Sequence, residues 1–164
     1  MSEQELKYVT FEGVKGEKWN KYDLSITNKR CIFIHLSSPL TFWGVFFGLL
    51  VALNALTIML IGYVIFGGVI LTIILYFVTA RIMQSFERGK RNKVVGQSLD
   101  AVLPLNSKNF TIDNSEITKV TMGKNGKSFM IGTNARKCNV EVALKDASKI
   151  SLLKTIPNFK EKIQ

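Results

Sequence analysis

The side chains that most often act as catalysts or metal ligands are few and widely separated in this 164-residue chain. It contains one histidine, His35, and two cysteines, Cys31 and Cys138. A zinc site needs several such ligands at close spacing, and acid–base catalysis needs a histidine or carboxylate with a suitable partner. The sequence has neither pattern, nor a glycine-rich phosphate loop. We therefore expect a protein that is not an enzyme and has no metal or cofactor, and we expect both thiols to be reduced and buried.

Positive charge is the remaining chemical signal. The formal net charge is +10, and the 84 residues from position 81 onward carry 16 basic and seven acidic side chains. Two basic clusters are candidate sites for lipid headgroups or other anions: Arg88, Lys90, Arg91 and Lys93, and then Lys124, Lys127, Arg136 and Lys137. The alternatives are topological charge beside a membrane for the first cluster and solvated turns for the second.

A long apolar run must position these clusters. From Pro39 to Ala80 there are 42 residues without Asp, Glu, Lys, Arg or His. A helix needs ~20 apolar residues to cross a bilayer, whereas a straight helix of this length would measure roughly 63 Å. We therefore predict two transmembrane helices, at about 39–60 and 63–83, with a turn near Gly62. A turn at Asn54 or at Gly67-Gly68 and a shallow re-entrant hairpin are the alternatives.

Lysine and arginine flank this run on both sides. Lys29 and Arg30 precede it, and five basic residues follow between positions 81 and 93. Because positive charge beside a span is retained in the cytoplasm, we expect two spans of the cell membrane with both termini cytoplasmic. Gly44 and Gly48, four residues apart, are candidates for close helix packing against the second span or another copy.

Alternating apolar residues predict strands on both sides of the run. The expected strands are 8–12, 19–27 and 30–36 before it, and 110–112, 117–122, 129–133 and 138–144 after it. Gly13 and Gly16 are expected to end the first strand, and Lys124–Lys127 is expected to form a tight Asn-Gly hairpin turn. Residues 84–93 are expected to be a helix end that unravels, and residues 94–108 a weak strand or loop.

The C-terminal segment has a different pattern. Ile150, Leu153 and Ile156 repeat at intervals of three, after Asp146 and before Pro157. This predicts an amphipathic helix that Asp146 caps and Pro157 ends, with its apolar face covering the open end of a small sheet or barrel.

Two short motifs resemble a known family. Tyr22–Ile34 (YDLSITNKRCIFI) looks like a strand pair of prokaryotic PH-like and GRAM-like membrane proteins, and Ile112–Met122 (IDNSEITKVTM) looks like a later strand in them. Asp113 departs from the proline of that pattern, and Cys31 from its apolar residue. The resemblance implies an α+β fold, a PH-like β-barrel or sheet with a C-terminal amphipathic helix, interrupted by a two-helix transmembrane hairpin.

The expected organisation follows. Residues 1–38 hold the first strands, residues 39–83 the hairpin, and residues 84–164 a basic juxtamembrane segment with the remaining strands and helix. The resemblance implies a membrane-anchored binding or scaffolding module at the cytoplasmic surface, which acts on anionic lipid headgroups or on a protein partner through its hairpin or barrel surface. The alternative is an accessory subunit of a membrane complex or transporter. Nucleic acid is less favoured, because the sequence lacks interleaved exposed aromatic and basic residues.

Overall fold

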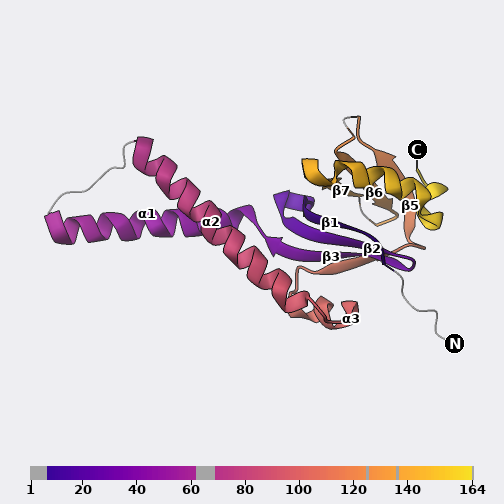
Figure 1. Cartoon of the computed structure of the whole chain (residues 1–164), viewed down its shortest axis with the longest axis horizontal. Helices are drawn as coiled ribbons and strands as arrows, with labels where there is room; N and C mark the ends of the chain where they lie inside the picture. The colour runs from indigo at the N-terminus through magenta and orange to yellow at the C-terminus, as the bar shows by residue number, and fades with distance from the viewer. Residues whose placement is uncertain (1–6, 62–68, 125, 136, 164) are drawn as a thin grey trace. The chain divides into compact units, whose positions relative to one another are not determined.

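The computed structural model describes residues 7–61, 69–124, 126–135 and 137–163, and the chain divides into two compact units (Figure 1). The first, the sheet unit, comprises Met1–Leu36 and Gly96–Gln164. The second, the helical unit, comprises Ser37–Val95. The helical unit is thus an insertion: the chain leaves the sheet unit at Leu36 and returns to it at Gly96.

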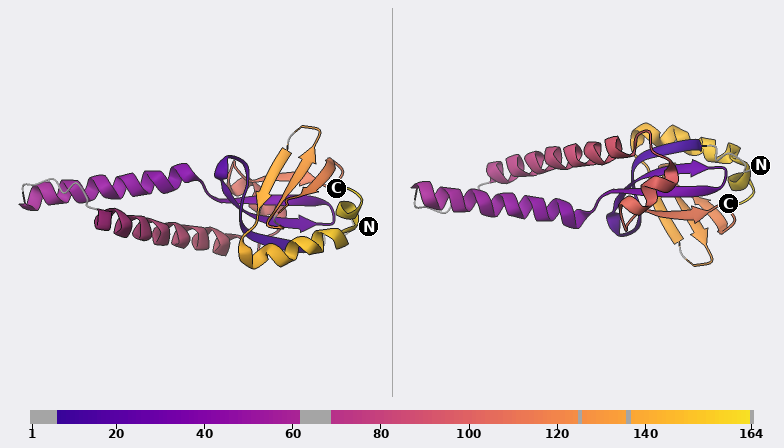
Figure 2. Two further views of the ribbon diagram at one scale, coloured as in Figure 1. Left: turned by 90° about the horizontal axis from the view of Figure 1, so that it is seen from above. Right: turned by 90° about the horizontal axis from the view of Figure 1, so that it is seen from below.

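Seven strands form one antiparallel sheet in the order β4-β3-β2-β1-β7-β6-β5. Figure 2 shows the strands of the sheet unit as arrows from two further sides. Their bounds are β1 Lys7–Lys15, β2 Lys21–Thr27, β3 Arg30–Ser37, β4 Phe110–Asp113, β5 Ile117–Met122, β6 Ser128–Thr133 and β7 Lys137–Glu141. The predicted α+β class is confirmed. The sheet is open, with β4 and β5 at its edges, and its inward positions are the alternating apolar residues of the sequence.

Strands from either side of the insertion pair directly. β3 runs antiparallel to β4, with Arg30 opposite Asp113 and Phe33 opposite Phe110. The Phe33 and Phe110 rings stack with their centroids 4.4 Å apart. The hydrophobic core is made of sheet-unit residues, from Val9 in β1 to Phe159 near the C-terminus. The sheet unit therefore has a core of its own.

The first strand is longer than its sequence predicts. β1 continues through Gly13, which we expected to end it, as far as Lys15. Gly13 has φ 62° at a bulge where the register with β2 shifts, and its N–H donates to Asp23 Oδ1 at 2.7 Å. A bulge adds one residue and returns the next side chain to the inner face, so Val14 is fully buried.

Two connections also differ from the prediction. Residues 94–108 contain two short helices, α3 (Leu99–Val102) and the 3-10 helix η2 (Leu103–Leu105), and the Ser98 hydroxyl caps the first. The expected tight turn after β5 is a longer connection, residues 123–127, closed by the Gly123 N–H donating to the Ser128 carbonyl at 2.8 Å. Asn125 lies outside the described residues, and Gly126 has the positive φ (61°) that its predicted turn requires.

The C-terminal segment is a 3-10 helix, η3 (Leu144–Thr155), followed by a short α-helix, α4 (Pro157–Lys160). The segment is therefore helical, as predicted, and its helix type is 3-10. In a 3-10 helix side chains three apart lie above one another, so the repeat of Ile150, Leu153 and Ile156 forms one stripe, and all three are buried. η3 ends at Thr155, just before Pro157, as predicted, and Pro157 also begins α4.

Asp146 does not cap this segment; it joins η3 to β1. The residue is 3% exposed, and its carboxylate accepts from Lys149 Nζ at 2.6 Å and from the Glu12 N–H at 3.4 Å. Burial opposes ionisation, but the hydrogen bonds from Lys149 and Glu12 and the charges of Lys149 and Lys145 outweigh it, so the pKa of Asp146 lies below its ordinary value.

We expect this carboxylate to make the sheet unit sensitive to acid. Because its pKa is lower in the folded than in the unfolded chain, its contribution is complete above the ordinary value of ~3.9 and is lost as pH falls through the folded pKa. Asp146→Asn should cost roughly 1–3 kcal/mol at neutral pH and flatten the decline of thermal stability between about pH 5 and pH 2, where this carboxylate takes up its proton. Melting curves followed by circular dichroism would measure this, with Asp113→Asn, an exposed site, as the control. Equal pH slopes in wild type and Asp146→Asn would contradict it.

The helical unit holds two long helices, α1 (Pro39–Ile61) and α2 (Val69–Val94). α1 is long and apolar enough to cross a membrane over Pro39–Leu56, and it is the one such helix in the described part of the chain. The expected second span begins in residues outside the described ranges, as does the turn at Gly62. The helices contact each other where Phe42 meets Tyr76, with ring centroids 5.4 Å apart.

One expectation about these helices fails. The basic segment 84–93 does not unravel, since α2 continues to Val94 and the buried Glu87 accepts from the Ser37 hydroxyl at 2.7 Å. A Cβ atom at Gly44 or Gly48 would meet nothing within 4 Å, so neither glycine packs closely against α2, and packing against another copy stays a prediction. Of the polar groups in α1, Asn54 donates to the Leu50 carbonyl at 2.8 Å, which lowers the cost of its place in an apolar helix.

Both cysteines are free and fully buried in the sheet-unit core, as expected. Burial, with a smaller contribution from the neighbouring Cys138, raises the pKa of the Cys31 thiol far above its ordinary value. Because the thiolate is the reactive form, these thiols should react only when the sheet unit opens. Their labelling therefore reports the unfolding of this unit within the whole chain.

Candidate functional site

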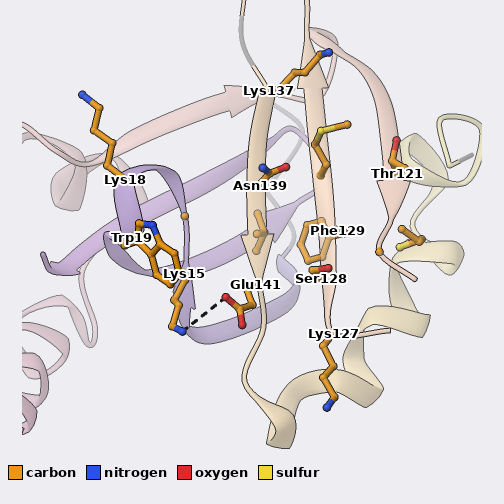
Figure 3. A pocket seen from close by; sticks show the side chains of 15 residues that line it. Lys15, Lys18, Trp19, Thr121, Lys127, Ser128, Phe129, Lys137, Asn139 and Glu141 are labelled. Atoms are coloured by element: carbon orange, nitrogen blue, oxygen red, sulfur yellow. Dashed lines mark ion pairs between the residues drawn. The ribbon is translucent and has the colours of Figure 1, made fainter. Parts of the chain in front are cut away.

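A groove of about 950 Å³ lies in the sheet unit between the β1–β2 connection and the strands β5, β6 and β7 (Figure 3). The side chains that line it are mostly basic or polar. They include Lys15, Lys18, Trp19, Thr121, Lys127, Ser128, Lys137, Asn139 and Glu141. The groove is thus assembled from segments more than 100 residues apart in sequence.

The β1–β2 connection presents a tryptophan to solvent. It forms a short 3-10 turn, η1 (Glu17–Trp19), in which Lys18 and Trp19 have φ values of 54° and 61°. Such angles in residues other than glycine cost roughly 1–2 kcal/mol each, so the surrounding structure must hold them. The Gly16 N–H donates to the Asn20 carbonyl at 2.8 Å and closes the turn. As a result Trp19 is 72% exposed at the rim of the groove.

Positive charge surrounds this tryptophan. Lys15 Nζ lies 5.4 Å from the centre of the Trp19 ring and 3.7 Å from the Glu141 carboxylate. Lys18, Lys127 and Lys137 have no acidic partner among the described residues. Because Glu141 offsets only one lysine, the groove has an excess of positive charge and favours an anionic ligand.

The structure brings together only part of the second predicted cluster. Lys127 and Lys137 both line the groove, at its opposite ends (Figure 3). Lys124 is exposed in the β5–β6 connection and does not line the groove, and Arg136 lies outside the described residues. The two turns therefore point toward different ends of the strands, as alternate hairpin turns do.

The first predicted cluster lies on α2, in the helical unit. Arg88 and Lys93 are exposed, and Lys90 and Arg91 are half-buried. The helix spacing places Arg88 and Arg91 on one face and Lys90 and Lys93 on nearly the opposite face, so the four form a basic end of α2 and not a single basic patch.

Sequence reasoning missed Lys15, Lys18 and Trp19. We expected Trp19 to begin a strand, and we found no interleaving of exposed aromatic and basic residues. The structure corrects the first point, because Trp19 precedes β2, which starts at Lys21. On the second point it adds a single exposed aromatic side chain close to lysines. The available signal was the local run Lys15-Gly16-Glu17-Lys18-Trp19. This run has the composition of a turn, with a glycine and two lysines, and the alternation of the following strand does not place Trp19 on its buried face.

No group of three or more His, Cys, Asp or Glu side chains that could hold a metal ion occurs within the described ranges. Comparison of the chain with protein-family models, with characterised proteins and with solved structures found no match. The case for a function therefore rests on the groove, the insertion and the physical chemistry of both.

Proposed function

We propose that this protein is a membrane-anchored binding module, with the helical unit as anchor and the sheet unit as the part that binds an anionic ligand or partner at the cytoplasmic face. The observation that carries this proposal is the pairing of β3 with β4 across an insertion that contains the apolar helix α1.

The pairing constrains how the chain can cross a membrane. If α1 crosses, the chain must cross again before β4, because β3 and β4 belong to one sheet. The first part of α2, as far as Ala80, belongs to the charge-free run and supplies the apolar residues for the second crossing. The contact of Phe42 with Tyr76 supports this arrangement, because aromatic residues of both spans favour the same membrane interface.

Charge supports a cytoplasmic sheet unit. The basic end of α2, which carries Arg88, Lys90, Arg91 and Lys93, immediately precedes the return to the sheet unit. Basic residues close to a span are retained in the cytoplasm and are attracted to its anionic lipids by about 1 kcal/mol each. They would hold the sheet unit close to the inner leaflet, with its groove available to a second ligand.

The resemblance to PH-like membrane proteins is part of the same proposal. An antiparallel meander followed by a C-terminal helical segment is compatible with that superfold. Fold alone does not imply a ligand, so the binding role rests on the basic groove and its exposed tryptophan.

Resistance to alkaline extraction tests the anchor. Wild-type protein should stay in membranes washed with alkaline carbonate, which releases peripheral proteins. Val51 and Ala55 lie one turn apart on the exposed side of α1, and arginine at both should cost roughly 5–7 kcal/mol of insertion and reduce the retained fraction severalfold. Gln84→Arg with Ser85→Arg, at the basic end of α2, is the control and should stay membrane-bound. Release of the wild-type chain would refute the anchor.

A further inference from the structure

The hydrogen-bonding phase of β7 determines which of its backbone groups face the groove. Val142 donates its N–H to the Lys127 carbonyl of the neighbouring chain segment at 2.8 Å. In an antiparallel ladder the bonded residues alternate, and the register between β6 and β7 is continuous. Val140 and Cys138 therefore direct their N–H and C=O groups toward β6. The odd-numbered residues of β7 direct theirs to the other side.

On that other side β7 is almost unpaired. Glu141 is the one residue of β7 paired with β1, opposite Lys15, where β1 ends. Beyond it, the outward N–H and C=O groups of Lys137 and Asn139 have no backbone partner among the described residues. Both residues are exposed and line the groove. The groove floor thus includes a short free strand edge, which is a template for another strand.

The charged groups are arranged along this edge. Lys137 lies at one end of β7 and Lys127 near the other, while Trp19 and Lys15 stand across from Asn139 and Glu141 (Figure 3). The ammonium groups are spread over the groove instead of converging on one point. An extended ligand with several negative charges matches this spacing.

We propose that the groove binds an extended acidic peptide segment of a partner protein, which adds as a strand to the free edge of β7 at Lys137 and Asn139 and packs against Trp19. Backbone hydrogen bonds give such a complex its register, and the lysines select acidic side chains. This names the partner class of the binding module proposed above and rests on that proposal.

Other anions fit the groove less well. A phosphate or lipid headgroup is best held by converging donors and by the paired N–H groups of arginine, and none of the described residues that line the groove is an arginine. Single-stranded nucleic acid needs several exposed aromatic rings for successive bases. Trp19 is exposed, but Phe129, the other aromatic side chain of the groove, is 2% exposed. Neither of these ligands uses the free backbone edge.

Fluorescence of Trp19 can test the proposal directly. The chain has two tryptophans, so Trp43→Phe leaves Trp19 as the single reporter. The whole chain, purified in a nonionic detergent, is titrated with an acetylated peptide of alternating Glu and Thr. Two matched peptides are controls: one with Lys in place of Glu, and one N-methylated at alternate backbone nitrogens. Because insertion into a bilayer is not needed for this measurement, its failure is distinguishable from failure of the anchor.

We expect the acidic peptide to bind and both control peptides to bind at least roughly tenfold more weakly. The N-methylated peptide loses one or two backbone hydrogen bonds to β7, and the lysine peptide has its charges reversed. Asn139→Pro removes one groove-facing N–H and leaves the ladder to β6 intact, and it should weaken binding roughly tenfold. Lys137→Glu should weaken it severalfold at low salt. Lys124→Glu, the same charge change outside the groove, should leave the affinity within about twofold.

Three results would overturn the proposal. The first is equal affinity for the acidic and N-methylated peptides, because it would show that no strand is added to β7. The second is unchanged affinity in both Asn139→Pro and Lys137→Glu. The third is displacement of the peptide by oligothymidine, or by phosphatidylglycerol dissolved in the same detergent micelles, at lower concentrations than the peptide needs, which would assign the groove to nucleic acid or lipid. The N-methylated peptide leaves the protein unaltered, so its result does not depend on how any variant folds.

Discussion

Replacing residues 38–95 with a flexible linker of about 15 Gly and Ser residues is expected to yield a soluble protein that keeps the sheet and its groove. The core cluster consists of sheet-unit residues, and β3 pairs with β4 across the insertion. The replaced segment contains the apolar helix α1, whose Trp43, Phe47, Val51 and Met59 side chains are exposed. Removing it takes away the exposed apolar surface of α1 and none of the sheet-unit core.

Fractionation measures the first half of this prediction, since the shortened chain should move almost entirely from the membrane pellet to the supernatant. Labelling of Cys31 and Cys138 measures the second half, because both thiols should stay protected until the protein is unfolded. The shortened chain should also bind the acidic peptide as the whole chain does. If it is soluble but its thiols react at once, the sheet unit needs the helical unit to fold, and an accessory-subunit role in which the helices are the functional part becomes the better account.

Phe33→Ala is expected to destabilise the sheet unit by roughly 3–5 kcal/mol. Phe33 is fully buried and stacks on Phe110 of β4. Its ring also contacts the Tyr22 ring edge-on, with the two ring centroids 6.0 Å apart. The substitution leaves a cavity at the point where the two halves of the chain join. The loss should therefore exceed that of a typical apolar truncation and favour separation of β3 from β4.

Pulsed labelling of the two buried thiols in increasing urea gives the unfolding midpoint of the sheet unit within the whole chain. Trp19→Ala is the matched control, because it also removes an aromatic side chain, but one that is 72% exposed. The free energy of unfolding of Trp19→Ala should agree with that of wild type to within about 0.5 kcal/mol, while its affinity for the peptide falls. A Phe33→Ala midpoint equal to that of Trp19→Ala would show that the β3–β4 contact contributes little.

Local patterns in the sequence were sufficient for most of the strands. Tyr22, Leu24 and Ile26 alternate with more polar residues, and all three are buried in β2. Strand period depends on neighbouring residues, which is why it can be read from a short stretch. The α+β class followed from these strands and the helices between them.

Patterns with more than one structural solution were misread, as at Gly13, or left the type of helix open, as at the C-terminus. Gly13 can end a strand or form a bulge, and a repeat of three such as Ile150 and Leu153 suits a 3-10 helix as well as one face of an α-helix. Local sequence does not decide between these; the packing of Val14 and of η3 into the core does.

The groove could not be predicted as a whole, because its parts meet only through the sheet. Lys127 and Lys137 were identified as basic turn residues, but their proximity to Trp19 depends on β7 lying beside β1. The free edge of β7 likewise depends on where β1 ends, at Lys15. Long-range pairing of this kind leaves no periodic signal in either segment.

Cysteine accessibility in intact and permeabilised cells tests most directly whether the sheet unit is held at the cytoplasmic face by two spans. Single cysteines are introduced as Lys124→Cys in the β5–β6 connection and Gly62→Cys between α1 and α2, in a chain with Cys31→Ala and Cys138→Ala. A membrane-impermeant maleimide should label position 62 in intact cells and position 124 only after permeabilisation. Labelling of position 124 in intact cells would place the sheet unit and its basic groove outside the cell and contradict the account.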